Sequence, residues 1–161
     1  PRVIDIGGGS MTYARAFAGR GARVTGLDLP PVLDLIRAEV EEEAAIETVA
    51  GDFRVGLPPG PYELAFLGNI CRIYGEKDNA RLFKKVFEVL AEVGRIAVLD
   101  YFRDLSGEAV YLDVNMLVHT NEGRTWPLKR YLEWLGDAGF SGASLQSLGA
   151  RQLIRAVKPV R

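Results

Sequence analysis

The sequence predicts an α/β fold in which helices cover both faces of a doubly wound, mostly parallel β-sheet. Segments with strand and helix patterns alternate five times between residues 2 and 102, an order that favours parallel strands joined by right-handed crossovers. The run from Tyr62 to Cys71 is almost continuously apolar, as expected for a strand buried on both faces. The first apolar run, Val3 to Ile6, ends in three glycines, which indicates a tight turn from a strand into a helix.

The first half of the chain contains three predicted strands and two predicted helices. Glycines at positions 19 and 21 end the first of these helices, and two prolines open the second. Most of the residues from Glu39 to Glu43 are acidic, which indicates a solvated helix face. The predicted strands are Arg2–Ile6, Ala22–Asp28 and Ile46–Phe53, and the predicted helices are Ser10–Arg20 and Pro30–Glu43.

The second half continues the alternation and then closes with a hairpin. Gly94 is predicted to cap one helix, and Thr125 is predicted to cap another that has Pro127 in its first turn. The predicted strands are Tyr62–Cys71, Arg95–Phe102, Ser144–Leu148 and Gln152–Val157, and the predicted helices are Asn79–Glu92, Ser106–His119 and Thr125–Ala138. The last two strands are short and separated by three residues, a spacing typical of a β-hairpin.

The composition is that of one globular domain. The 161 residues are 48% hydrophobic and 25% charged, with a net charge of −1, so the chain can build one ample core. Excess positive charge for binding nucleic acid is lacking, and so is an apolar run of about 18 residues for spanning a membrane. One cysteine, Cys71, excludes an internal disulfide and a multi-cysteine metal site. We therefore expect a cytoplasmic protein without a metal, whose partner is a small molecule.

The glycine turn predicts a cofactor site of the nucleotide type. Unpaired N–H groups and the positive end of a helix favour an anionic or electron-rich ligand there. Gly7 and Gly9 fill the first two places of the dinucleotide fingerprint, but Thr12 stands where its third small residue belongs. The acidic residue ahead of the glycines, in Asp5-x-Gly-Gly-Gly, instead resembles the first motif of class I methyltransferases that use S-adenosylmethionine (SAM).

Two later acidic residues also stand at predicted strand ends. Asp28 follows the glycines by about 20 residues, the position at which a carboxylate accepts both hydroxyls of a ribose. SAM and NAD both contain such a ribose, and a turn-forming Asp before Pro30 is a third interpretation. Asp52 can accept the exocyclic amine of adenine, and Phe53 can pack on the adenine ring.

Taken in order, the motifs resemble one family over nearly the whole chain, residues 1–161. They are Asp5-x-Gly-Gly-Gly, Gly-Leu-Asp28-Leu-Pro, Gly51-Asp-Phe, Leu67-Gly-Asn-Ile, Arg124-Thr-Trp and Glu133-Trp-Leu-x-x-Ala-Gly-Phe140. This set resembles the catalytic domain of the plant-type and bacterial small-molecule O-methyltransferases, which include caffeic acid, hydroxyindole and polyketide O-methyltransferases. The resemblance implies a seven-stranded Rossmann-like sheet with an antiparallel C-terminal hairpin. It also implies an N-terminal dimerisation domain missing from this chain, and hence a homodimer.

The resemblance further implies a set of SAM-binding residues. Gly7 and Gly9 would face the methionine part, Asp28 the ribose, and Asp52 with Phe53 the adenine. Three more implied contacts come from Asp5, Leu29 and Asn69, which belong to the same motifs. Gly68 stands where the family usually has a lysine, so one polar contact to the cofactor is in question.

The chemistry departs from the family at its usual base. Arg72 stands in the place of the family's catalytic histidine, and Asp100 and Gly123 stand in the places of its two acidic neighbours. Arginine stays protonated and cannot remove a proton, so we expect Arg72 to hold an anionic group. His119, the single histidine, is an alternative base or a packed helix-end residue.

Methyl transfer remains the favoured function without the usual base. Alignment of the reactants can lower a barrier by about 7 to 11 kcal/mol, whereas general base catalysis is typically worth about 3 to 5 kcal/mol. We therefore predict methylation of a small aromatic or polyketide-like molecule, with oxygen as the preferred acceptor. Methylation of a ring carbon, a non-catalytic SAM-binding relative and an NAD-dependent oxidoreductase are the alternatives.

Overall fold

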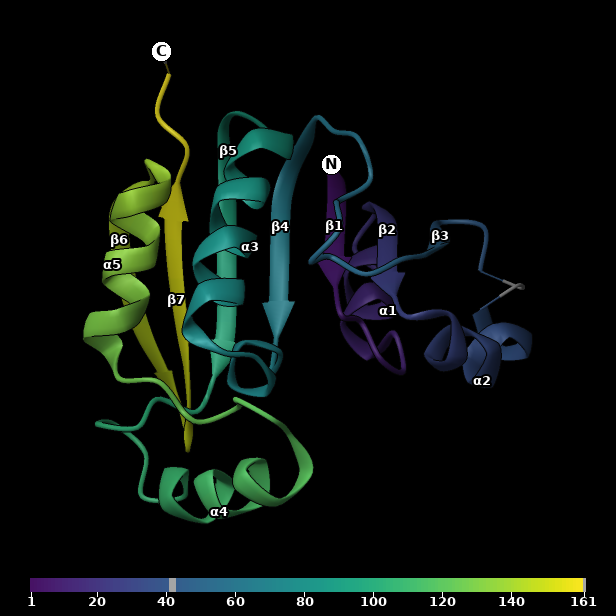
Figure 1. The fold of residues 1–161 in the computed structure, drawn as a ribbon. Coiled ribbons are helices and arrows are strands. Elements are labelled where there is room, and N and C mark those ends of the chain that lie inside the picture. Colours follow the sequence, from purple (N-terminus) through teal and green to yellow (C-terminus); the bar gives the residue numbers. More distant parts are fainter. Residues whose placement is uncertain (41–42, 161) are drawn as a thin grey trace.

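The protein, described by a computed structural model over residues 1–40 and 43–160, is built around one mixed sheet. Within these residues the sheet has seven strands in the order β3-β2-β1-β4-β5-β7-β6 (Figure 1). The first five strands run parallel, and β7 pairs antiparallel with both β5 and β6. Their bounds are β1 Arg2–Ile6, β2 Arg23–Asp28, β3 Ile46–Ala50, β4 Tyr62–Gly68, β5 Leu90–Asp100, β6 Ser141–Leu148 and β7 Arg151–Val157. The predicted doubly wound sheet with its C-terminal hairpin is confirmed.

Most of the helices pack against the sheet, and one helix lies beyond its carboxyl edge. The helix α1 (Thr12–Ala18) contacts β1 and β2, and α2 (Pro30–Val40) contacts β3. In front of the sheet in Figure 1 lie α3 (Glu76–Val89) and α5 (Leu128–Ala138), which contact each other. The helix α4 (Ala109–His119) lies past the end at which the β4 arrow points (Figure 1). This end is the carboxyl edge of the parallel strands, where open α/β sheets place their ligands.

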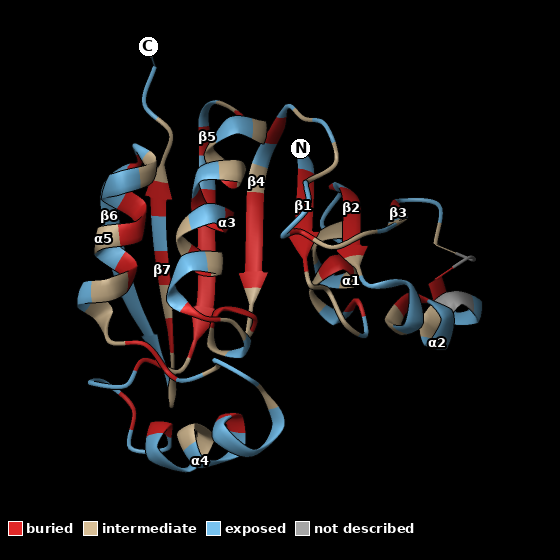
Figure 2. Ribbon diagram, viewed as in Figure 1, coloured by how far each residue is buried: buried red, intermediate tan, exposed pale blue. Residues whose placement is uncertain are grey.

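Alternation along the strands divides the core between the two faces. Ala65 and Leu67 of β4 belong to the large cluster that contains the aromatic residues of α3 and α5. Phe66 faces the other way, with Tyr13 of α1 packed against it. The strands β1, β2 and β4 are accordingly buried along most of their length, whereas the edge strand β6 is exposed throughout and α4 is largely exposed (Figure 2). An apolar groove of about 670 Å³ opens beside α1, between that helix and β4, β5 and β7.

Seven predicted helix boundaries were wrong. The first helix ends at Ala18 rather than Arg20, the third begins at Glu76 rather than Asn79, and the fourth begins at Ala109 rather than Ser106. The first helix begins at Thr12 rather than Ser10, after Met11 in a left-handed conformation with φ of 57°. The helix predicted to extend to Glu43 ends at Val40, and residues 41–42 of its predicted acidic run lie outside the described residues. The helix predicted to be capped by Gly94 ends at Val89, five residues before that glycine, because β5 already begins at Leu90.

Thr125 does not cap α5. Its N–H and its hydroxyl both donate to Asp113 Oδ1, at 2.6 and 2.8 Å, and the helix begins three residues later. The N–H of Leu128 donates to Asp104 Oδ1 at 3.0 Å, so an aspartate from a preceding loop satisfies the first amide of the helix. Among the described residues, no helix is long and apolar enough to cross a membrane.

Candidate active site

The turn after β1 requires glycine at two positions. Gly7 and Gly9 have φ of 70° and 54°, in the left-handed region that glycine occupies without strain. A Cβ on Gly7 would also collide with Cδ1 of Ile70. The N–H of Gly7 donates to the carbonyl of Leu27 at 2.8 Å, which joins the turn to the neighbouring strand. At Gly9, in contrast, a Cβ would meet no atom within 4 Å, so the backbone is open to close approach by a ligand at that residue.

Asp28, at the tip of β2, is held in place by backbone amides. Its Oδ2 accepts the N–H of Gly9 at 2.8 Å, and its Oδ1 accepts the N–H of Leu29 at 2.7 Å. A carboxylate has about four lone-pair sites, so each oxygen keeps acceptor capacity for a further donor. This geometry suits the Asp28 carboxylate to accept hydrogen bonds from the two hydroxyls of a diol.

One small pocket brings together five of the predicted cofactor residues. It encloses about 20 Å³, room for about one water molecule. The lining residues are Gly7, Leu27, Asp28, Leu29, Gly51, Asp52, Phe53, Ile70 and Tyr74. Tyr74 was not predicted from the sequence, although its place in the loop after a central parallel strand was a usable signal.

The side of the pocket beyond β3 is closed by contacts among its own side chains. Arg54 donates from Nε and a terminal nitrogen to Asp52 Oδ2, at 2.9 and 2.7 Å, and this hydrogen bonding lowers the pKa of Asp52. The guanidinium carbon of Arg54 lies 5.5 Å from the centre of the Tyr74 ring. Tyr74 meets Phe53 edge to face, with ring centres 4.7 Å apart. Burial raises the pKa of Tyr74.

Asp5 lies beneath the glycine turn. Its side chain is buried, and Oδ2 has no hydrogen-bond partner among the described residues. Burial raises the pKa of Asp5 to about 7, and the nearby charge of Asp28 adds to the shift. A Cβ built on Gly8 would lie 3.1 Å from Asp5 Oδ2 and 2.7 Å from the Met11 sulfur. Asp5 therefore packs against the glycine turn at Gly8. It does not line the small pocket.

Arg72 forms an ion pair at the carboxyl edge of the sheet. It follows β4 in the short 3₁₀ helix η1 (Cys71–Ile73). A terminal nitrogen of its guanidinium donates to Asp100 Oδ1 at 2.8 Å and to Asn69 Oδ1 at 3.0 Å. Asp100 is fully buried, and this burial raises the pKa of its carboxyl group while Arg72 opposes the rise. Nε of Arg72 is buried without a partner among the described residues. The positive charge of Arg72 is therefore fixed in place and largely compensated.

His119 is exposed at the end of α4. Its Nδ1 lies 2.9 Å from the carbonyl oxygen of Asn115 in the same helix, and it does not line the small pocket. Asp113 fastens α4 to the loops on both sides of it, because it accepts from Arg103 in the preceding loop at 2.8 Å and from Thr125 in the loop before α5 at 2.6 Å.

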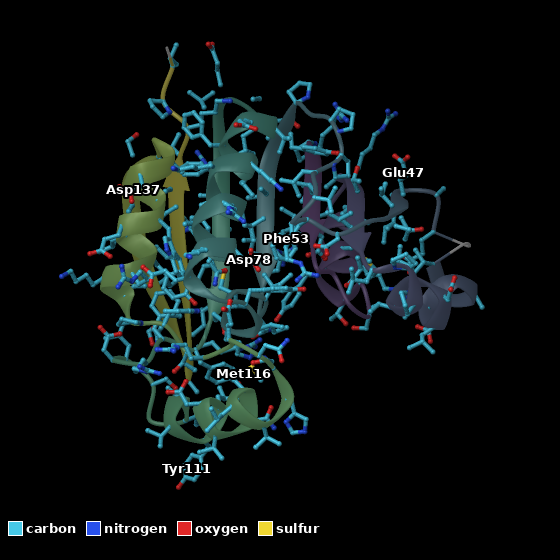
Figure 3. The ribbon with its side chains drawn as sticks, in the orientation of Figure 1. Glu47, Phe53, Asp78, Tyr111, Met116 and Asp137 are labelled. Atoms are coloured by element: carbon cyan, nitrogen blue, oxygen red, sulfur yellow. The ribbon has the colours of Figure 1, made fainter. Side chains whose placement is uncertain are left out.

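The outer side of α4 carries an apolar stripe that faces solvent. Figure 3 shows Tyr111 pointing away from the sheet, whereas Met116 on the inner side is buried. The members of the stripe are Val110, Tyr111, Val114, Leu117 and Val118, which are each more than half exposed. Exposed contiguous apolar surface of this kind marks contact with a ligand or another protein surface.

Comparison with known proteins gives consistent matches. Residues 1–141 match the model of the O-methyltransferase domain family. The chain is 27% identical over 169 residues to 3-hydroxy-5-methyl-1-naphthoate 3-O-methyltransferase of Streptomyces sahachiroi, an alignment that covers 98% of this chain and 49% of that protein. The chain spans half or less of the length of curated relatives that it matches.

Solved structures agree with the fold. An O-methyltransferase family 2 protein of Planctomyces limnophilus, solved in complex with apigenin, is 28% identical with a TM-score of 0.86, over 98% of this chain and 49% of that chain. PigF, solved with SAH, is 27% identical with a TM-score of 0.86, over 98% of this chain and 50% of that chain.

Proposed function

The chain belongs to the O-methyltransferase domain family, and from this premise we propose that the whole protein transfers a methyl group from SAM to a small aromatic or polyketide-like molecule. The observation that carries the proposal is the pocket at the carboxyl edge of the sheet, which gathers five of the predicted cofactor residues. The apigenin and naphthoate named for two relatives support an aromatic substrate. Oxygen is the preferred acceptor atom.

The donor and acceptor groups of the site suit SAM. Asp28, oriented by the amides of Gly9 and Leu29, would accept the ribose hydroxyls. Asp52 would accept the adenine amine, with Phe53 and Tyr74 beside the ring, and the glycine turn would face the methionine part. Asp5 supports that turn, and Asn69 would approach the cofactor from the end of β4. When bound, SAM supplies a methyl group already activated by its sulfonium. The SAH in PigF supports this choice of cofactor.

We propose that Arg72 binds an anionic oxygen of the substrate rather than removing its proton. Asp100 and Asn69 fix the orientation of the guanidinium, and its remaining donors can face a phenolate. A phenol acidic enough to ionise in water needs no protein base, so the loss of about 3 to 5 kcal/mol from base catalysis matters less. His119 is the second candidate for proton removal, and it requires a substrate that extends to the exposed end of α4.

Transfer of an isotopically labelled methyl group from SAM to a panel of phenols of increasing acidity tests the proposal on the intact protein. We expect turnover to rise with the acidity of the phenol up to the point at which the phenol is fully ionised at the assay pH. A methoxy signal in the product would identify O-methylation, and a ring-methyl signal would identify C-methylation. SAM binding without transfer to any acceptor would instead support a non-catalytic relative, which the compensated charge of Arg72 also favours.

Arg72→Ala is the variant that examines the proposed substrate contact. The expected result is weaker binding of the ionised phenol together with slower turnover, because an anion loses its fixed cation. Arg20→Ala serves as the matched control, since Arg20 is exposed beyond the far end of α1. Unchanged turnover and unchanged substrate affinity in Arg72→Ala would refute this role.

We also propose that the whole protein is a homodimer. The exposed apolar stripe on α4 and the apolar groove beside α1 support it, because both leave nonpolar surface for a further contact. Light scattering of the intact protein after gel filtration should give twice the mass of one chain. A monomer mass would contradict the proposal. The N-terminal dimerisation domain and the cytoplasmic location stay predictions from the sequence.

A further inference from the structure

Arg54 makes contacts with two of the residues assigned above to adenine. Three hydrogen bonds from its side chain engage both oxygens of Asp52, and the N–H of Arg54 adds a fourth at 2.8 Å. The same guanidinium lies over the ring of Tyr74. The acceptor and one aromatic wall that an adenine would need are therefore already engaged by a side chain of the protein itself.

The space between the aromatic walls is also filled. A flat ring stacked between two others needs a separation near 3.5 to 4 Å on each of its sides. The centres of the Phe53 and Tyr74 rings are only 4.7 Å apart, and the pocket has room for about one water molecule. Adenine can stack between these two rings only if Tyr74 moves away from Phe53.

Phe53 is the more deeply buried of the two walls. It is buried, with 5% of its surface exposed, and its carbonyl accepts a hydrogen bond from Nζ of Lys85 at 3.0 Å. Tyr74 is only half-buried. The side chain of Arg54 is 49% exposed, so its contacts are of the weak, solvent-screened kind that can open and close.

From this geometry we propose that Arg54 is a latch that closes the adenine part of the cofactor site. It holds Tyr74 through the ring contact and Asp52 through the ion pair, and the cofactor displaces it from both. This inference rests on the proposed function, since it assumes that the site binds an adenosine. It assigns to Arg54 a role in setting cofactor affinity without any contact to the reacting atoms.

Calorimetric titration with SAH, carried out on the intact protein and on Arg54→Ala, tests the latch. SAH is the probe because it carries the adenosine but lacks the sulfonium charge of SAM. An exposed ion pair together with an exposed cation–π contact corresponds to an affinity gain of about threefold to thirtyfold in Arg54→Ala. Arg20→Ala is the matched control and should leave SAH affinity unchanged. Equal or weaker SAH binding by Arg54→Ala would overturn the latch.

A second measurement follows the latch directly. The Nε–H signal of Arg54 in a ¹⁵N NMR spectrum should move to the position of a free arginine when SAH saturates the protein. A signal that keeps its position would overturn the displacement. Failure of the proposed function would give a different result, because neither the wild type nor Arg54→Ala would then bind SAH. That result would overturn the cofactor site and the latch together.

Discussion

Replacing Asp5 by Asn is expected to remove a large part of the dependence of stability on pH. Burial raises the pKa of Asp5 from 3.8 to about 7. Between these values the folded protein keeps the proton that the unfolded chain has already released. The folded state then binds more protons than the unfolded state, so the free energy of unfolding falls as pH rises.

The magnitude follows from the separation of the two pKa values. Each pH unit between 3.8 and about 7 lowers the free energy of unfolding by ~1.4 kcal/mol, which gives about 4 kcal/mol in all. The contribution of the protonated group is complete below pH 3.8 and is lost once the pH has passed about 7. Asn carries no charge at any of these pH values. The free energy of unfolding of Asp5→Asn minus that of the wild type should therefore rise by about 4 kcal/mol from pH 4 to pH 8.

Urea unfolding at a series of pH values measures this difference. Other titrating groups, such as Asp100, are present in both proteins and cancel. A packing defect caused by Asn shifts the difference by the same amount at every pH and leaves its slope unchanged. Asp137→Asn, on the exposed side of α5 (Figure 3), is the matched control and should give a flat line. A flat line for Asp5→Asn would show that the pKa of Asp5 is not raised in the folded protein.

Two further variants test residues that hold the elements around the site in place. Met11→Gly should lower the free energy of unfolding by about 1 to 3 kcal/mol in urea unfolding, because relief of the left-handed conformation offsets only part of the loss of a buried side chain. An unchanged or higher stability would contradict this. Asp113→Ala should speed hydrogen exchange at the Thr125 amide and cost about 1 to 3 kcal/mol, because it removes both hydrogen bonds of that residue. Unchanged protection of the amide would show that Asp113 does not fasten α4.

The order of elements could be predicted from the sequence because each signal is local. Apolar residues repeat with the period of a strand or a helix, and glycine marks the turn after β1. The start of α1 could not be placed, because it depends on Met11. A methionine takes the left-handed conformation there, and its side chain fills the space above Gly8 and Gly26. Nothing in the local pattern indicates that tertiary contact.

The contacts around the site were harder to predict, because they join pairs of residues that are distant in the chain. Thr125 has the residue type of a helix cap, but Asp113 on another helix competes successfully for its N–H and hydroxyl. Strand order placed the glycine turn, Asp28 and Asp52 at one edge, because parallel strands end together. The closure of the pocket was not predictable, since it requires Arg54 after β3 to meet Tyr74 after β4.

Calorimetric titration of the intact protein with SAM, with NADH titrated in parallel, tests whether the site binds SAM. Asp28 can accept the ribose hydroxyls of either cofactor, so it does not distinguish SAM from NADH. The glycine turn and the family favour SAM. We expect micromolar binding of SAM and no binding of NADH. Binding of NADH, or no binding of SAM by the correctly folded protein, would contradict this expectation.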